Sequence, residues 1–287
     1  MRRLPDIIAD ENSMTTLVNL TDALQGLASI RIAHIKNQVQ KSQEYFDELW
    51  RIYNQIRVDQ AFRFGRTGEA KIINKELLIA ITAESGFNGD IDEKLINWML
   101  EKHDPAKQDI IIIGHHGVVK LTQAGVSFNK YYKLPESDTN LNVRPLVSQV
   151  RLYRSTSVYY QTYVSLMVQD IKKIELKKAV QEAGDKVELT KEDVISEATY
   201  IFEPSTYAVV AHLERAMLEI SLLQTILDSK LAQYAARFRS MSLAHKKAAG
   251  TQQDLHVLYN QTRRSLNDER LKNIINGIKK VRKAYVS

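Results

Sequence analysis

The last part of the chain constrains the fold most strongly, because it contains almost nothing that interrupts a helix. From Pro204 the sequence runs to Ser287 without a further proline, and only Gly250 and Gly277 stand in between. Proline breaks a helix and glycine weakens one, whereas other residues cost far less. This stretch is therefore predicted to form one very long helix.

The same criterion divides the rest of the chain. Between Asp6 and Arg63 the only helix-weakening residue is Gly26, whereas residues 64–203 hold most of the prolines and glycines. The sequence thus predicts three parts. They are an amino-terminal coiled-coil helix at 1–63, a globular α/β domain at 64–203 and a long carboxy-terminal coiled-coil helix at 204–287.

Both terminal segments carry apolar residues at the spacing of about 3.5 residues that is typical of a left-handed supercoil. The seam of the last segment weakens at His245 and Gln252, and the step from Leu27 to Ile35 is out of phase, which predicts a stutter in the first helix. The predicted seams consist of Leu17, Leu20, Leu24, Leu27, Ile35, Val39, Phe46, Leu49, Tyr53 and Ile56 in the first helix, and of Leu213, Met217, Ile220, Gln224, Leu227, Leu231, Tyr234, Phe238 and Met241 in the last.

Because a domain separates the two helices in the sequence, they are expected to pair as an antiparallel two-helix coiled coil. At about 1.5 Å per residue, the first helix, from Met14 to Arg57, spans roughly 65 Å and the second on the order of 120 Å. The second helix is therefore expected to extend beyond the first. The alternative, in which both helices bundle against the middle domain, is disfavoured because they far exceed the mean globular helix of about 12 residues.

The middle of the chain alternates short apolar runs with amphipathic segments. Predicted strands lie at 76–82, 109–113, 126–128, 158–164 and 197–202, and predicted helices at 92–101, 118–124 and 144–154. Such alternation predicts an open, mostly parallel sheet covered on both sides, which is a small Rossmann-like α/β domain inserted between the two helices. The polar, acidic segment 180–193 is predicted to be a flexible loop.

The turn after the first predicted strand does not read as a nucleotide-binding loop. The string Ser85-Gly86-Phe87-Asn88-Gly89-Asp90 lacks the GxGxxG spacing, and Asp90 and Asp92 would repel a phosphate. Gly86 and Gly89 are interpreted as turn formers, with Asp90 or Asp92 capping the next helix. The chain also contains no P-loop and no nucleophile elbow.

The adjacent residues His115 and His116 could supply two metal ligands, but no partner stands at metal-binding spacing, so a solvated strand-to-helix turn is favoured. The chain has no cysteine, which excludes disulfides, cysteine zinc sites and cysteine nucleophiles. The sequence therefore predicts no catalytic residues, no cofactor and no metal. No apolar run approaches the roughly 18 residues of a membrane helix, and no targeting peptide is recognised, so a soluble chain is expected.

The end of the last helix is strongly basic. Such a tip suits nucleic acid, an anionic lipid surface or an acidic cavity in a protein. Because Tyr285 is its only aromatic residue, base stacking is disfavoured, and nucleic acid is not predicted as a partner. Against only Asp268 and Glu269, the basic residues are Arg263, Arg264, Arg270, Lys272, Lys279, Lys280, Arg282 and Lys283.

Four strings, together with the layout, resemble the gamma subunit of the F-type ATP synthase. The most specific is Tyr200-Ile201-Phe202-Glu203-Pro204-Ser205, which matches the strand-to-helix junction of that family. The others are the strand–turn–helix at 78–92, the small-residue stretch Ser229-Lys230-x-Ala232-x-x-Ala235-Ala236-Arg237-x-x-Ser240-Met241, and an approximate end motif from Leu258-Tyr259-Asn260 to Gly277.

The chain departs from the family pattern at several places. The turn Ser85-Gly86-Phe87-Asn88-Gly89 replaces the Arg-Gly-Leu-Cys-Gly that members usually carry, and Arg264 replaces the usual glutamine. The family's basic, methionine-rich first helix is largely replaced around 21–33, and a basic extension follows Gly277. These departures fit a divergent bacterial member or an F1-like relative.

The resemblance implies a non-catalytic rotor subunit of the central stalk, which couples ion-driven rotation of the membrane ring to catalysis in the alpha–beta hexamer. The α/β domain would form a foot against the epsilon subunit and the c-ring, at the cytoplasmic face of the bacterial cell membrane. Arg263, Arg264 and Glu269 would contact loops of the beta subunits, and Pro204 would form the junction turn. The alternatives are a free-standing coiled-coil scaffold or tether with an α/β head, and a nucleotide- or metal-using enzyme that no motif supports.

Overall fold

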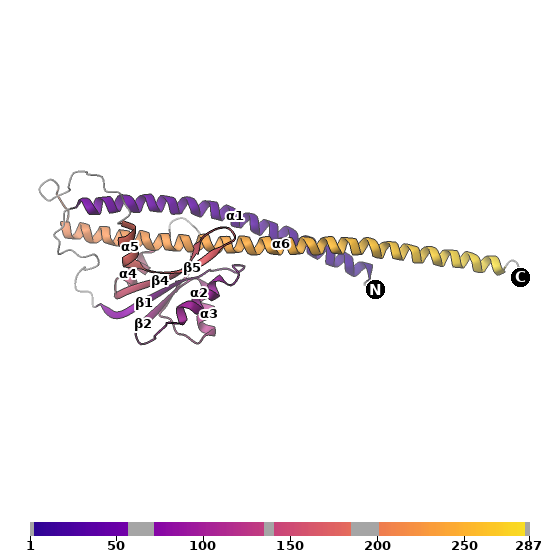
Figure 1. The fold of residues 1–287 in the computed structure, drawn as a ribbon, viewed down its shortest axis with the longest axis horizontal. Coiled ribbons are helices and arrows are strands. Elements are labelled where there is room, and N and C mark those ends of the chain that lie inside the picture. The colour runs from indigo at the N-terminus through magenta and orange to yellow at the C-terminus, as the bar shows by residue number, and fades with distance from the viewer. Residues whose placement is uncertain (1–2, 57–71, 135–140, 185–200, 285–287) are drawn as a thin grey trace. The chain divides into compact units, whose positions relative to one another are not determined.

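The computed structural model describes residues 3–56, 72–134, 141–184 and 201–284, which belong to two compact units, one of residues 1–27 with 240–287 and one of residues 28–239. Two long helices, α1 (Leu4–Gln55) and α6 (Thr206–Ala284), contribute to both units (Figure 1). Between them follow β1 (Ile73–Ile81), α2 (Ile91–Leu100), β2 (Gln108–Ile113), α3 (His115–Gln123), β3 (Lys130–Tyr132), α4 (Arg144–Val150), β4 (Tyr153–Tyr163), β5 (Gln169–Glu175) and α5 (Leu176–Gly184).

The helix predicted from the lack of proline is present without a break. α6 runs from Thr206 to Ala284 and passes through both Gly250 and Gly277. α1 likewise continues through Gly26, and it begins at Leu4, well before the predicted start at Met14.

The larger unit, residues 28–239, contains a five-stranded sheet in the order β3-β2-β1-β4-β5. β1 pairs in parallel with β2 and with β4, β2 pairs in parallel with β3, and β4 pairs antiparallel with β5. In the central strand, Leu78 stands opposite Ile110 of β2 and Ser157 of β4. The predicted open, mostly parallel sheet is confirmed, with an additional antiparallel strand at one edge.

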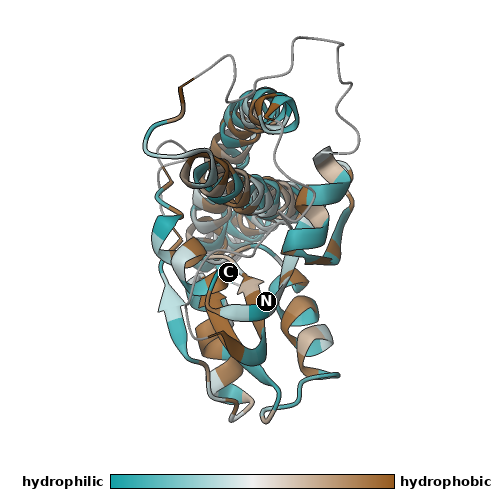
Figure 2. Cartoon of the chain, turned by 90° about the vertical axis from the view of Figure 1, so that its left-hand side faces the viewer, coloured by the Kyte–Doolittle hydropathy of each residue, from teal (hydrophilic) through white to brown (hydrophobic). Residues whose placement is uncertain are grey.

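Residues that follow one another along β1 point to opposite faces of the sheet. Leu77, Ile79 and Ile81 are buried in one apolar cluster with residues of α1, α4, α5 and α6. Leu78 and Ala80 are buried in a second cluster with residues of α2 and α3. Helices therefore cover both faces, and Figure 2 shows apolar residues gathered in the strands between them. Burial of each large aliphatic side chain contributes roughly 1.5–3 kcal/mol to folding.

In the larger unit, α1 and α6 pack side by side and run in opposite directions. Ile35 of α1 lies in one apolar cluster with Leu231 of α6. Further along α1, the Gln43 side-chain oxygen accepts a hydrogen bond at 3.1 Å from Nε2 of Gln224, which precedes Leu231 in α6. α6 lies between α1 and the sheet (Figures 1 and 2).

In the smaller unit, the first part of α1 also pairs antiparallel with α6. His245 and Gln252, which weaken the predicted seam of α6, both contact polar residues of α1, as does His256, so the two seam residues have a packing role. Nδ1 of His256 donates to Glu11 at 3.0 Å, Nε2 of Gln252 donates to the Thr15 hydroxyl at 2.8 Å, and Nδ1 of His245 lies 3.5 Å from the Thr21 hydroxyl.

The seam of α1 differs from the predicted one. The predicted seam residues Leu17, Leu20 and Leu27 are exposed. The buried positions recur instead at multiples of seven residues and stay in phase beyond residue 27, so the predicted stutter is wrong. Small and polar residues occupy this part of the seam and aliphatic residues point outward, which misleads a pattern built on the largest apolar side chains. Buried positions in this register include Ile7, Thr21, Ala28 and Ile35.

Several predicted elements of the middle domain need correction. The predicted helix at 144–154 ends at Val150, and the strand predicted at 158–164 begins earlier, at Tyr153. Residues 126–128 are not a strand, and the short strand β3 follows at Lys130–Tyr132 instead. Of the predicted strand at 197–202, residues 197–200 lie outside the described residues, and Ile201 and Phe202 are not in a strand.

Two elements, β5 and α5, were not predicted. In β5, Gln169, Ile171 and Ile174 are half-buried and the other residues are exposed. Two consecutive exposed lysines interrupt the alternation of apolar and polar residues by which a strand is recognised in a sequence. α5 includes the start of the predicted flexible loop at 180–193, where Val180 is fully buried, while residues 185–193 lie outside the described residues. At the end of α5, a Cβ on Gly184 would come within 1.9 Å of the Trp50 ring, so only glycine fits there.

Candidate functional site

The carboxyl ends of β1 and β4 lie where the strand order reverses, because β2 and β4 flank β1 on opposite sides. In open α/β sheets, ligands bind in the crevice at such a point. In this chain α6 reaches that place, since Ser229 and Gln233 both donate hydrogen bonds to Gln161 of β4. The edge that holds a nucleotide in other α/β folds is therefore an attachment point for a helix here.

We call this attachment the sheet–helix junction and define it as Asp92 of α2, His116 of α3, Gln161 of β4, and Ser229 and Gln233 of α6. The Asp92 carboxylate is only 4 % exposed and accepts hydrogen bonds from Nε2 of Gln161 at 2.5 Å and from Nδ1 of His116 at 2.8 Å. The Gln161 side-chain oxygen accepts hydrogen bonds from the Ser229 hydroxyl and, at 3.3 Å, from Nε2 of Gln233. Because a buried polar group without a partner costs about 1–3 kcal/mol, this network holds α6 against the domain.

The histidine pair lies in the first turn of α3 and its two members have different partners. The hydrogen bond to Asp92 raises the pKa of His116, and this effect outweighs burial, which acts in the opposite direction. The backbone N–H of His115 donates to Glu84 at 3.1 Å. Within the described residues, no group of three or more histidine, aspartate or glutamate side chains could hold a metal ion.

The turn after β1 packs against α6. Phe87 and Gly89 both have φ near +70°. The Arg237 guanidinium donates to the Ser85 hydroxyl at 2.6 Å, to the Ser85 carbonyl at 3.2 Å and to the Asn88 side-chain oxygen at 3.4 Å. This turn is thus a second contact between the domain and α6, next to the sheet–helix junction.

The remaining residues assigned to turns occupy less constrained positions. Gly86 has open space around it, and Pro204 precedes α6 after a cis peptide bond. Asp90 stands at the N-cap of α2, but its side chain forms no capping hydrogen bond and pairs with Lys94 at 2.8 Å. Because Asp92 belongs to the sheet–helix junction, the predicted side-chain capping of α2 by an aspartate is wrong.

Asp92 and Gln161 were not predicted as junction residues, because buried hydrogen-bonding partners on separate elements leave no motif in the sequence. One signal was present. The small-residue stretch that begins at Ser229 matches the part of α6 that lies on the sheet, where Ser229, Ala232 and Ala235 are fully buried. Small side chains there let the helix backbone approach the domain closely.

The predicted partner-contact residues lie on α6 in the smaller unit. Arg263, Arg264 and Glu269 are all exposed. Arg264 and Glu269 line the same shallow surface depression, whereas Arg263 does not. Further along, α6 exposes a group of large aliphatic side chains, namely Leu271, Ile274, Ile275 and Ile278.

Comparison with known proteins shows to which family the chain belongs. Residues 6–281 match the family model described as ATP synthase. The chain belongs to the ATP synthase family. The resemblance to the gamma subunit is confirmed by its relatives. This chain is 24% identical over 275 residues to the ATP synthase gamma chain of Clostridium novyi, and the alignment covers 92% of this chain and 93% of the other. It is 22% identical over 299 residues to that of Mycoplasmoides gallisepticum, covering 98% and 100%.

Solved structures of this family share the fold. A chain in the mitochondrial ATP synthase of Euglena gracilis, in a structure of its OSCP, F1 and c-ring, superimposes with a TM-score of 0.61 at 14% identity, covering 96% of this chain and 94% of that one. A chain in the rotor structure of the same enzyme gives a TM-score of 0.59 at 15% identity, covering 91% and 99%. Within the described residues of this chain, no helix is both long and apolar enough to cross a membrane.

Proposed function

We propose that this chain is the central rotor shaft of a rotary ATP synthase and performs no ATP chemistry itself. The arrangement of α6 supports the proposal. α6 is unbroken, pairs antiparallel with α1 in each unit, and is fastened to the α/β domain by the buried sheet–helix junction. A domain held by buried hydrogen bonds can pass torque to a helix pair, whereas a flexible tether cannot.

The shaft contributes asymmetry to catalysis. Catalytic sites that face different sides of one stiff, asymmetric element meet different contacts, and different contacts give the sites different nucleotide affinities. Antiparallel helix packing supplies the stiffness in each unit, and α6 contributes residues to both units.

The partners follow from this assignment. The helical end would lie within the hexamer of alpha and beta subunits, and the domain at 64–203 would serve as the foot against the epsilon subunit and the c-ring. The complex would hold the chain peripherally at the cytoplasmic face of the bacterial membrane. Exposed Arg263, Arg264 and Glu269 would contact loops of the beta subunits, where arginines can pair with carboxylates through two hydrogen bonds.

The double variant Arg263→Ala, Arg264→Ala tests this role. Because both side chains are exposed, the fold and its stability should be unchanged, while ATP turnover coupled to ion transport should fall. The matched control is Lys246→Ala with Lys247→Ala, which removes the same charge from exposed positions of the same helix and should leave coupled turnover unchanged. If the first variant assembles and turns over like the wild type, the assigned contacts are wrong.

Co-purification tests the function as a whole. Affinity purification of the tagged chain should recover alpha, beta and epsilon subunits in defined proportions. Recovery of the chain without them would overturn the rotor assignment and favour the free-standing scaffold.

A further inference from the structure

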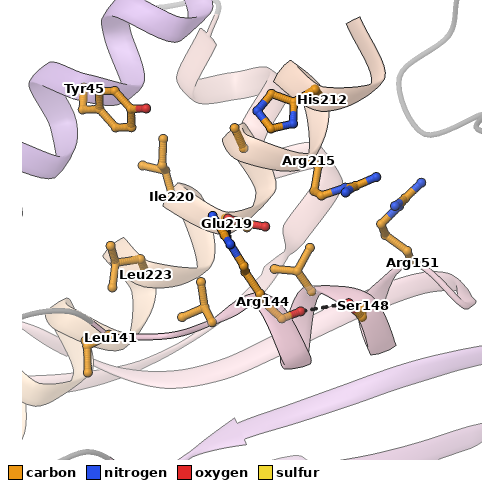
Figure 3. Close-up of a pocket in the computed structure, with 13 residues that line it drawn as sticks. Tyr45, Leu141, Arg144, Ser148, Arg151, His212, Arg215, Glu219, Ile220 and Leu223 are labelled. Carbon is orange, nitrogen blue, oxygen red and sulfur yellow. Dashed lines mark hydrogen bonds and ion pairs between the residues drawn. The ribbon is translucent and has the colours of Figure 1, made fainter. Parts of the chain in front are cut away.

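The contact between α6 and the α/β domain differs along the helix. Near the start of α6, residues of α1, α4 and α6 line a pocket of about 630 Å³ (Figure 3). In its lining the Arg144 guanidinium lies 3.7 Å from Glu219, but the Arg144 side chain is exposed, so this ion pair contributes little. By contrast, the hydrogen bonds from Gln161 to α6 are buried. The sheet–helix junction therefore contributes more to holding α6 on the domain.

The hydrogen bonds of the sheet–helix junction run in one direction. An ionised carboxylate only accepts hydrogen bonds, so Asp92 requires that Gln161 turn its NH₂ group toward α2. The Gln161 oxygen then faces α6, where it accepts hydrogen bonds from Ser229 and Gln233. Asp92 thus sets the orientation of Gln161, and this orientation makes both contacts with α6 possible.

His116 is the member of the sheet–helix junction that solvent reaches. Its side chain is 32% exposed, whereas Asp92, Gln161, Ser229 and Gln233 are buried. Nδ1 of His116 lies 2.8 Å from the Asp92 carboxylate, and among the described residues no other cationic side chain lies within ion-pair distance of that carboxylate. A proton from solvent can therefore reach the ring, and its charge balances an almost fully buried anion.

Charged groups of three other elements lie around the His116 ring, namely Asp92 of α2, Glu84 in the turn after β1 and Arg237 of α6. On α3 itself, Lys120 pairs with Glu93 of α2 at 2.9 Å. The hydrogen bond to Asp92 has the largest effect and raises the pKa of His116, while burial and Arg237 lower it and Glu84 raises it. The proton is therefore held mainly by the residue that orients Gln161.

A buried carboxylate without a counter-charge is costly, so any conformation that returns it to water becomes more favourable. When the His116 ring loses its proton, Asp92 stays ionised but its charge is no longer balanced. Movement of Asp92 toward solvent would break its hydrogen bond to Gln161. Gln161 would then no longer be held with its oxygen toward α6.

We propose that His116 is a positioning residue for α6, whose proton fastens the α/β domain to the shaft and whose deprotonation loosens this attachment. The inference rests on the proposed function, because the attachment affects turnover only if the domain transmits torque. The attachment is tightest in acid and loosens as pH rises through the folded pKa of His116. Coupled turnover therefore depends on the pH around the domain, in addition to the pH dependence of the catalytic sites.

Thiol labelling of the full chain tests the loosening. The chain has no cysteine, so a single Ala236→Cys reports when α6 leaves the domain, since Ala236 is buried and lies between Gln233 and Arg237, which both contact the domain. At pH 6, labelling should be about threefold or more faster with His116→Gln than with His116 in place, and at pH 8 the two rates should be equal. Comparing both chains at one pH cancels the ionisation of the thiol. Thr225→Cys, a second buried position of α6, is the reporter if Ala236→Cys does not fold.

Asn88→Ala is the matched control. It weakens the neighbouring contact of Arg237 with the turn after β1 but removes no titratable group, so it should speed labelling by the same factor at both pH values. A His116→Gln effect that is absent, constant with pH or larger at pH 8 would overturn the proposal.

The assembled complex provides the second arm. The ratio of ATP-driven ion transport to ATP hydrolysis should fall by about half or more with His116→Gln at pH 6 and should match the wild type at pH 8. If labelling changes as expected but this ratio does not, the attachment does not control coupling and the proposal is wrong. If alpha and beta subunits do not co-purify with the chain, the proposed function itself fails, while labelling of the full chain still decides whether the proton fastens α6 to the domain.

Discussion

Gly114 ends β2 with a backbone that only glycine adopts without strain. Its φ is +95° and its ψ is 143°. A Cβ at this position would stand 2.0 Å from the carbonyl oxygen of Thr82, which follows β1. The Thr82 hydroxyl in turn accepts a hydrogen bond at 2.9 Å from the backbone N–H of Gly117. One residue therefore decides whether α3 can start directly beside the end of β1.

Replacing Gly114 with alanine should lower the free energy of unfolding by about 3 kcal/mol or more, since it adds both backbone strain and a clash with main-chain atoms. Urea unfolding followed by circular dichroism would measure the loss. Gly26→Ala is the matched control. It lies inside α1 with nothing within 4 Å of the added Cβ, and it should raise the free energy of unfolding by up to about 1 kcal/mol. Equal effects of the two substitutions would contradict this account.

His116 makes the stability of the fold depend on pH. Its pKa is raised in the folded chain, chiefly by the hydrogen bond to Asp92, so folding favours the protonated form. The stabilisation is fully present below the unfolded pKa of about 6.5 and disappears as pH rises through the folded pKa. His116→Gln should therefore destabilise the chain more at pH 6 than at pH 8.

Urea unfolding of wild type and variant at several pH values would measure this difference. His115→Gln, which leaves the backbone N–H of that residue in place, is the matched control. A His116→Gln penalty that is constant or grows with pH would exclude the proposed role of the Asp92 contact.

At the scale of elements, the sequence predicted the helices and strands whose residue pattern is distinctive within their own segment. A long segment without proline predicted α6, and the apolar run at the centre of the sheet predicted β1, which is buried on both faces. The seam of α1 was not predictable in the same way, because Thr21 and Ala28 are buried while Leu20 and Leu27 are exposed. Which face of a helix is buried depends on its partner, and the partner is not local in sequence.

The sheet–helix junction illustrates the same limit. Asp92, Gln161 and Ser229 come from three distant parts of the chain, and each is an ordinary polar residue in its own segment. The structure brings them together because α6 crosses the carboxyl ends of β1 and β4. Only their mutual hydrogen bonds distinguish them from surface residues.

Gln161→Ala should lower the free energy of unfolding by about 2–3 kcal/mol, because it leaves groups of Asp92 and Ser229 without their partner in a buried site. Gln224→Ala is the matched control. It removes an exposed hydrogen bond between α6 and α1, and it should change the stability by no more than about 0.5 kcal/mol. Chemical denaturation of both variants, and of each combined with Ser229→Ala, would test the coupling. Strict additivity of Gln161→Ala and Ser229→Ala would show that the network does not act as a unit.

At the scale of the whole molecule, the chain leaves many large apolar side chains in contact with solvent. Exposed aliphatic residues occur on α1 at Leu17, Leu20 and Leu27, and near the end of α6 at Leu271, Ile274, Ile275 and Ile278. Contiguous apolar surface of this kind marks contact with another protein. An isolated chain with such surfaces should self-associate, and this self-association should disappear when the chain is assembled in its complex.

Serine substitutions near the end of α6 would test this interpretation. Ile275→Ser with Ile278→Ser should leave the stability of the isolated chain within about 0.5 kcal/mol per site, because both side chains are exposed. The variant should sediment as a smaller species than the wild type, and it should assemble less well with alpha and beta subunits. By contrast, Leu255→Ser changes a buried seam residue of the same helix and should cost about 2–5 kcal/mol of stability. If the double variant sediments and assembles like the wild type, the exposed aliphatic residues of α6 do not form a partner surface.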